Sequence, residues 1–97
     1  PQQSGDLVRL KSLVDEKTVL VTHNPCYGIL DEPDPGRHVG GKELLKLCEE
    51  RKPKYHIYGH IHESAGVQGN HFNVSYPGKK SILKIEYYSG EYEFIKV

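Results

Sequence analysis

Two stretches of the chain carry apolar residues at helical spacing. The first covers residues 5–14 and follows a Ser-Gly-Asp segment of the kind that caps helices. The second covers residues 41–52 and stops at Pro53, because proline cannot continue a helix. The apolar side chains that share one face of this second stretch are Leu44, Leu45, Leu47 and Cys48. The spacing therefore predicts two helices.

Two short apolar runs follow these helices and have the pattern of strands. The run Val19-Leu20-Val21 is unbroken and β-branched, which is typical of a strand buried on both faces. The second run, KYHIYGH, covers residues 54–60. The order helix, strand, helix, strand predicts neighbouring parallel strands. Their carboxyl ends then lie at one edge of the sheet, where α/β proteins usually bind ligands.

The pattern of apolar residues changes after Ala65. Three short aromatic and β-branched runs, over residues 67–76, 81–88 and 91–97, are joined by Gly-Asn, Pro-Gly and Ser-Gly turns. Such runs predict antiparallel hairpins. With no repeat and no linker, residues 1–97 are expected to form one organised α/β unit in which the hairpins follow the parallel strands.

Composition and charge narrow the function classes. The 97 residues include 13 Lys and Arg and 13 Asp and Glu, so no positive field favours nucleic acid or an acidic membrane face. No apolar run approaches the roughly 20 residues of a membrane span, and we expect a soluble protein. Two cysteines do not make a disulfide framework, which fits a reducing cytoplasm.

Three of the six histidines fall at predicted strand ends. His23 ends the first strand, and His60 and His62 flank Ile61 after the second. In an extended segment alternate side chains share a side, so His60 and His62 are expected to point together with Ile61 turned to the core. An isolated His-x-His pair also fits surface or hydrogen-bonded histidines. The addition of His23 favours a metal site, because imidazoles suit Mn, Fe, Co, Ni or Zn.

Four segments in order, VTHNPCYG, HVGGKELL, PKYHIYGHIHE and FNVS, resemble the last motifs of the calcineurin-like metallophosphoesterases. The resemblance extends over residues 17–76 and is strongest to the small phosphodiesterase branch. It implies the carboxyl-terminal half of an α/β/β/α sandwich. It also implies that His23 and His60 bind the second of two divalent metal ions and that His62 binds the first.

The mechanism that this resemblance implies uses two metals to activate a hydroxide and neutralise phosphoryl oxygens. The full-length protein would then hydrolyse phosphodiesters or phosphomonoesters of small or nucleotide-like molecules. The family also has Asp-x-His, Gly-Asp and Gly-Asn-His motifs upstream of the Thr-His segment. The 22 residues before His23 contain no convincing match to any of these motifs. We therefore expect residues 1–97 to be a partial domain that needs an amino-terminal half and is inactive alone.

The other polar residues carry weaker signals. His38, before a predicted helix start, is a candidate contact for substrate phosphate, although an exposed loop histidine fits as well. Asn73 matches the family's Asn-x-Ser, which implies that it either orients the metal ligands from behind or packs the strand. His56, in mid-strand, is expected to be packed or hydrogen-bonded. The acidic residues of the long loop over residues 24–41, namely Asp31, Glu32 and Asp34, are expected to be solvated.

Two alternatives to a small-molecule phosphoesterase remain at this stage. A DNA nuclease or protein phosphatase of the same superfamily would need a basic stripe or a docking extension, and the sequence shows neither. A non-catalytic relative that serves as an interaction scaffold would have no need of three converging imidazoles. The sequence therefore favours an enzyme.

Overall fold

The computed structural model describes residues 9, 11–75 and 81–96, and within them four strands form one sheet in the order β1-β2-β4-β3. Strand β1 (Val19–Val21) pairs in parallel with β2 (Tyr55–Tyr58), as predicted. Strand β2 also pairs in parallel with β4 (His71–Asn73), which forms a hairpin with β3 (Gly66–Gln68). The predicted hairpin turn at Gly-Asn is confirmed, and its second strand extends the parallel sheet.

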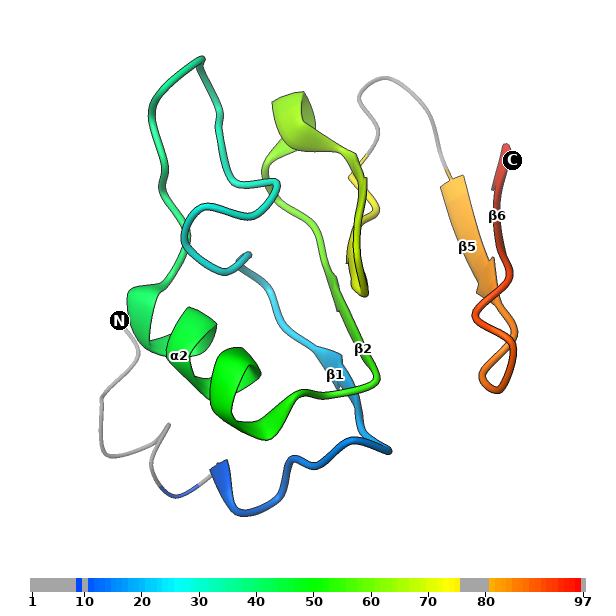
Figure 1. Cartoon of the computed structure of the whole chain (residues 1–97). Coiled ribbons are helices and arrows are strands. Elements are labelled where there is room, and N and C mark those ends of the chain that lie inside the picture. Colours follow the sequence, from blue (N-terminus) through cyan, green and yellow to red (C-terminus); the bar gives the residue numbers. More distant parts are fainter. Residues whose placement is uncertain (1–8, 10, 76–80, 97) are drawn as a thin grey trace.

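Helix α2 (Lys42–Arg51) covers one face of this sheet (Figure 1), which confirms the helix predicted over residues 41–52. It ends at Lys52, whose φ of 50° is left-handed and whose N–H bonds the carbonyl of Cys48. Its buried side chains are Leu44, Leu47 and Cys48, and they form a hydrophobic cluster with Val14 and Cys26. The core thus lies between α2 and the sheet.

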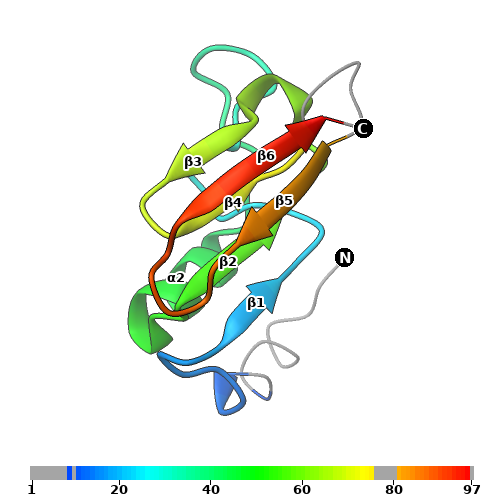
Figure 2. The same cartoon turned by 90° about the vertical axis from the view of Figure 1, so that its right-hand side faces the viewer.

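A second hairpin covers the opposite face of the sheet. It consists of β5 (Ser81–Ile85) and β6 (Tyr92–Lys96), which pair antiparallel as predicted. The Tyr55 hydroxyl donates to the carbonyl of Tyr87 at 2.6 Å, and the rings of Phe72 and Tyr92 lie 5.3 Å apart. Figure 2 shows this hairpin in front of β2 and β4 with α2 behind. The described residues thus stack as helix, sheet and hairpin in a mixed α/β arrangement.

The prediction that the first strand is buried on both faces is wrong. Val19 is 43% exposed and Val21 69% exposed, and only Leu20 packs against the core. Strand β1 has a single partner among the described strands, and the β5–β6 hairpin lies over β2 and β4 (Figure 2). An apolar run indicates that a strand can be buried. The position of β1 at the edge of this sheet decides how much of its side-chain surface is covered.

The first predicted helix, over residues 5–14, falls largely outside the described residues. Residues 9 and 11 are helical, residues 12–13 form a turn, and Val14 is buried beyond it. The predicted Pro-Gly turn at residues 77–78 also lies outside the described part. Among the described helices, none has the length and apolar character needed to cross a membrane.

Candidate functional site

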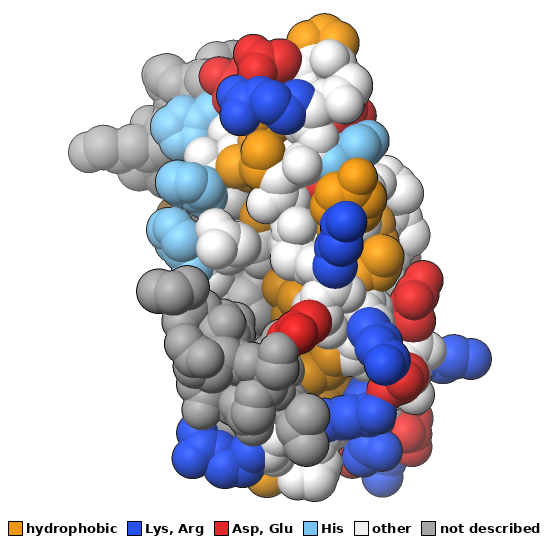
Figure 3. Space-filling model, turned by 90° about the vertical axis from the view of Figure 1, so that its left-hand side faces the viewer, with side chains coloured by type: hydrophobic (Ala, Val, Ile, Leu, Met, Phe, Trp, Pro, Cys, Tyr) orange, Lys and Arg blue, Asp and Glu red, His pale blue; other side chains and the backbone are white. Residues whose placement is uncertain are grey.

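His23 and His60 meet where the two parallel strands end. Each lies two residues beyond its strand, β1 or β2, and the register that pairs Val21 with Ile57 brings these ends together. The two imidazole rings are 4.7 Å apart between centroids and tilted by 43°. Both side chains are exposed, and Figure 3 shows histidine side chains gathered along one edge of the molecule.

The backbone around His60 is strained. Its φ is 74°, and the N–H of Ile61 donates across it to the carbonyl of Gly59 at 2.9 Å. A bond of this span over a residue with that φ is a γ-turn of the rare, strained kind. Strained residues cluster at active sites and ligand clamps, because the surrounding structure has to hold them. The strain therefore marks His60 as a functional candidate.

The predicted extended conformation from His60 to His62 is wrong. Strand β2 ends at Tyr58, and His62 begins the 3₁₀ helix η1 (His62–Ser64). Ile61 is buried as expected, but a turn separates the two histidines, so simple alternation does not set their directions. The Ser64 hydroxyl ties η1 to the long loop, donating to the carbonyl of Glu32 at 2.6 Å and accepting from its N–H at 2.9 Å.

The side chain of Asn73 supports the turn around His60 and Ile61. It is fully buried on β4, and its amide donates to the carbonyls of Ile61 at 2.9 Å and Leu30 at 3.2 Å. Its oxygen accepts from the hydroxyl and the N–H of Ser75, which fixes the orientation of the amide. Asn73 thus positions Ile61, the residue between the two predicted ligands His60 and His62.

The long loop is organised by a buried carboxylate. Asp31 is 1% exposed and accepts from the N–H groups of Gly28 and Gly40, both at 2.9 Å, and from Nδ1 of His38 at 2.7 Å. The prediction that Asp31 is solvated is therefore wrong. Burial by itself would raise the pKa of Asp31, but the bonds from His38, Gly28 and Gly40 outweigh it and lower that pKa. The carboxylate in turn raises the pKa of His38.

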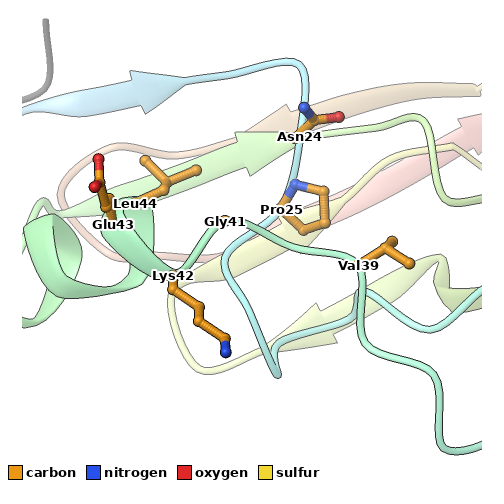
Figure 4. Close-up of a pocket in the computed structure, with 7 residues that line it drawn as sticks. All are labelled: Asn24, Pro25, Val39, Gly41, Lys42, Glu43 and Leu44. Carbon is orange, nitrogen blue, oxygen red and sulfur yellow. The ribbon is translucent and has the colours of Figure 1, made fainter. Parts of the chain in front are cut away.

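A pocket of about 270 Å³ lies at the amino end of α2 (Figure 4). It is bordered by Asn24, which follows His23, and by Val39, which follows His38. The other lining residues are Pro25, Gly41, Lys42, Glu43 and Leu44. The amino end of a helix and the side chain of Lys42 favour anions, whereas the carboxylate of Glu43 opposes them, so this pocket offers room for part of an anionic molecule on its Lys42 side.

The structure also brings together residues that local sequence patterns did not connect. His56 is fully buried, as expected for a packed histidine, and its Nε2 lies 2.8 Å from the Thr22 hydroxyl. Its Nδ1 lies 3.1 Å from Nδ1 of His71 and 3.7 Å from the Cys26 sulfur. Burial and the nearby His71 lower the pKa of His56 to about 4. Pairing of β2 with β4 produces the His56–His71 contact, for which the sequence offers no short-range signal.

The described residues that could hold a metal fall into two sets. His23 and His60 face each other, whereas His62 does not share a tight three-residue group with them. A separate group consists of Cys26, Cys48 and His56, whose ligand atoms all lie within 4.8 Å of one another. The first set is exposed at the strand ends, and the second is buried under α2.

Comparisons with known proteins identify the family of the chain. A family model for calcineurin-like phosphoesterases matches residues 2–64, so the chain belongs to that family, as its motifs predicted. Membership supports a phosphoesterase-type function with divalent metals.

Curated proteins of two animals are similar to part of this chain. UPF0046 protein K07C11.7 of Caenorhabditis elegans is 43% identical over 60 residues, which are 62% of this chain and 20% of that protein. Metallophosphoesterase domain-containing protein 1 of Homo sapiens is 43% identical over 54 residues, 54% of this chain and 17% of that protein. The chain thus spans a fifth or less of the length of these two relatives. No solved structure matches it significantly.

Proposed function

We propose that the whole protein carrying these residues hydrolyses phosphodiesters or phosphomonoesters of small or nucleotide-like molecules with two divalent metal ions. His23 and His60 bind one ion and His62 binds the other. The observation that carries this proposal is that the rings of His23 and His60 lie 4.7 Å apart between centroids at the ends of parallel strands. His60 is held there in a strained turn.

The donors fit divalent transition metals. Two exposed imidazoles at one sheet edge suit Mn, Fe, Co, Ni or Zn, and the strained turn keeps one of them in place without an ion. His62 lies outside a tight group with the other two, which fits its assignment to the other ion of the pair. When bound, a pair of such ions supplies a nucleophile at neutral pH and neutralises charge on phosphoryl oxygens.

The chain's own residues orient the ligands and the substrate. Asn73 holds the carbonyl of Ile61 and thereby the turn that presents His60 and His62. His38 carries a positive charge more readily than an ordinary histidine, because Asp31 raises its pKa. A charged His38 can donate to a phosphate oxygen, and the pocket at the amino end of α2, which the next residue Val39 lines, can accept part of the molecule.

The two relatives are about five to six times as long as the segment that each shares with this chain, so we expect the remaining ligands among residues outside these 97. Carboxylates are the expected additions, because hard oxygen donors complete most two-metal hydrolase sites. We therefore assign the activity to the whole polypeptide and the three imidazole ligands to this part of it.

The test uses the longest natural polypeptide that contains these residues. We expect His62→Ala to abolish manganese-stimulated hydrolysis of bis(p-nitrophenyl) phosphate. The exposed Glu16→Gln variant, at the far end of the strands from the site, is the matched control and should retain full turnover. Unchanged turnover in His62→Ala contradicts its role, and absence of metal-stimulated turnover in the parent polypeptide favours the scaffold alternative.

A further inference from the structure

A cluster of sulfur and nitrogen donors lies buried between α2 and the sheet, apart from the exposed histidines. Cys26 and His56 are 0% exposed and Cys48 is 7% exposed. They come from three elements: the loop after β1, helix α2 and strand β2. All three ligand atoms lie within 4.8 Å of one another. Neither cysteine takes part in a disulfide, so both sulfurs are available as ligands.

The hydrogen bonds of His56 leave its Nδ1 as an acceptor, which contacts Nδ1 of His71 at 3.1 Å and can exchange that contact for a metal ion. The Thr22 hydroxyl donates to the carbonyl of Asn24 at 2.7 Å, so its oxygen accepts the proton of His56 Nε2 at 2.8 Å. This assignment leaves Nδ1 of His56 without a proton and with its lone pair toward Cys26. An imidazole that ligates a metal usually donates its other N–H to an outer partner in this way.

The spacings within the cluster match a tetrahedral zinc site. The two sulfurs are 3.6 Å apart, Cys26 Sγ and His56 Nδ1 are 3.7 Å apart, and Nδ1 of His71 is 3.1 Å from Nδ1 of His56. Ordinary zinc bond lengths give tetrahedral edges of about 3.8 Å for S···S, about 3.6 Å for S···N and about 3.4 Å for N···N. Cys26, Cys48 and His56 therefore lie near the spacing of a zinc site, whereas His71 is close to His56 but outside the group of three and has to move toward the sulfurs to reach the same ion.

An ion has a route to this cluster. A cavity of about 180 Å³ is bordered by Cys48 and His71, one ligand and the nearest further donor. The remaining lining residues are Ile29, Leu45, Glu49, Lys52 and Asn70. The cavity reaches the cluster at Cys48, and none of the strand-end histidines lines it.

We propose that Cys26, Cys48 and His56 bind one Zn²⁺ ion that ties α2 to the sheet, and that His71 moves toward the ion to complete the four ligands. On binding, both thiols release their protons to solvent, and the two thiolates balance the charge of the ion. Contact with Cys48 and burial raise the pKa of Cys26, so the thiol is protonated in the absence of a metal. The site is independent of the proposed hydrolysis, because it shares no ligand with His23, His60 or His62.

The test is spectroscopic and uses the full chain, purified with its thiols reduced and stripped of metal. Added Co²⁺ should produce the near-ultraviolet charge-transfer band of cobalt bound to thiolates, saturating at one ion per chain, and Zn²⁺ should bleach it. This measurement needs no substitution, so it stands even if a variant fails to fold. A folded chain that gives no thiolate band, or that is found with a Cys26–Cys48 disulfide when purified without reductant, overturns the proposal.

Variants separate the two metal sites. The band should be lost or at least halved in Cys48→Ser, and unchanged in a triple His23→Ala, His60→Ala, His62→Ala chain. Thr22→Val, which removes the acceptor for His56 Nε2, should weaken Zn²⁺ binding by roughly 10- to 100-fold, and Thr22→Ser should restore it. Loss of the band in the triple variant, with circular dichroism showing it folded, would assign the ion to the strand-end site and refute this one.

Discussion

Nδ1 of His38 lies 2.7 Å from Oδ1 of Asp31, and this pair joins the two arms of the long loop between β1 and α2. Asp31 is buried and also accepts the N–H groups of Gly28 and Gly40, so the loop folds around one carboxylate. A loop of this length without helix or strand needs such an anchor, because its backbone groups otherwise remain unpaired. Figure 4 shows the pocket that this loop and the amino end of α2 line together.

The first prediction concerns this pair. The pKa of His38 is raised above its ordinary value of 6.5, chiefly by the hydrogen bond to Asp31. The pair therefore stabilises the folded chain fully below pH 6.5, and that contribution is lost as the pH rises through the folded pKa. NMR titration of His38 should show its pKa fall toward the ordinary value in Asp31→Asn. An identical titration curve in the two chains would rule out the pairing.

The second prediction concerns the amide that supports the metal-ligand turn. Asn73→Asp keeps the size of the side chain but removes the donors to the carbonyls of Ile61 and Leu30. The carbonyl of Ile61 keeps the N–H of Ser64 at 3.2 Å, whereas the carbonyl of Leu30 loses the Asn73 donor, so urea unfolding should show a loss of about 1–3 kcal/mol. Asn24→Ala, at an exposed position, should change the free energy of unfolding by less than about 0.5 kcal/mol. Equal effects of the two substitutions would contradict the structural role of Asn73.

Two adjacent glycines provide the third prediction. A Cβ atom at Gly40 would contact the carbonyl of Cys26 and lie 2.6 Å from the Tyr27 nitrogen, both backbone atoms that cannot move aside easily. Gly40→Ala should therefore lower the free energy of unfolding by about 1–3 kcal/mol or more.

Gly41→Ala is the matched control, since its nearest neighbour would be Leu44 Cβ at 3.4 Å. Its effect should stay below about 1 kcal/mol, because a weaker helix cap and a less flexible unfolded chain oppose each other. Similar losses in both variants would show that the loop does not approach Gly40 as closely as described.

The fourth prediction concerns the chain on its own. We expect the 97 residues to hydrolyse bis(p-nitrophenyl) phosphate no faster than a metal-only blank at any manganese concentration. Among the described residues, no carboxylate joins the strand-end histidines in a tight group, so two ions lack a shared ligand there. Steady-state turnover is the measurement, and the whole polypeptide is the positive control. Turnover above the blank would mean that these residues alone complete the site.

Local sequence patterns were sufficient to predict helix α2 and the pairing of strands β1 and β2. The helical spacing before Pro53 predicted α2 within one residue at each end, because periodicity and a proline stop act over a few residues. The order of elements predicted the parallel pairing of β1 with β2, since a helical crossover returns the chain to the same edge. His23 and His60 could therefore be placed together before any coordinates were known.

Long-range contacts decided the details of the site. Alternation predicted an extended run through His60, but burial of Ile61 and its bond to Asn73 accompany a γ-turn there. Acidic composition predicted a solvated Asp31, but closure of the loop buried it. Neither outcome is visible in a short window of sequence.

The sequence by itself determined the family, the parallel strands and the histidines at their ends, because motifs and hydrophobic periodicity are properties of neighbouring residues. Only the tertiary structure decided which of those groups face one another and what strain they carry. It alone brought Cys26 to Cys48, 22 residues away, and to His56, 30 residues away. Packing of a helix on a sheet sets such distances, and no spacing along the chain encodes them.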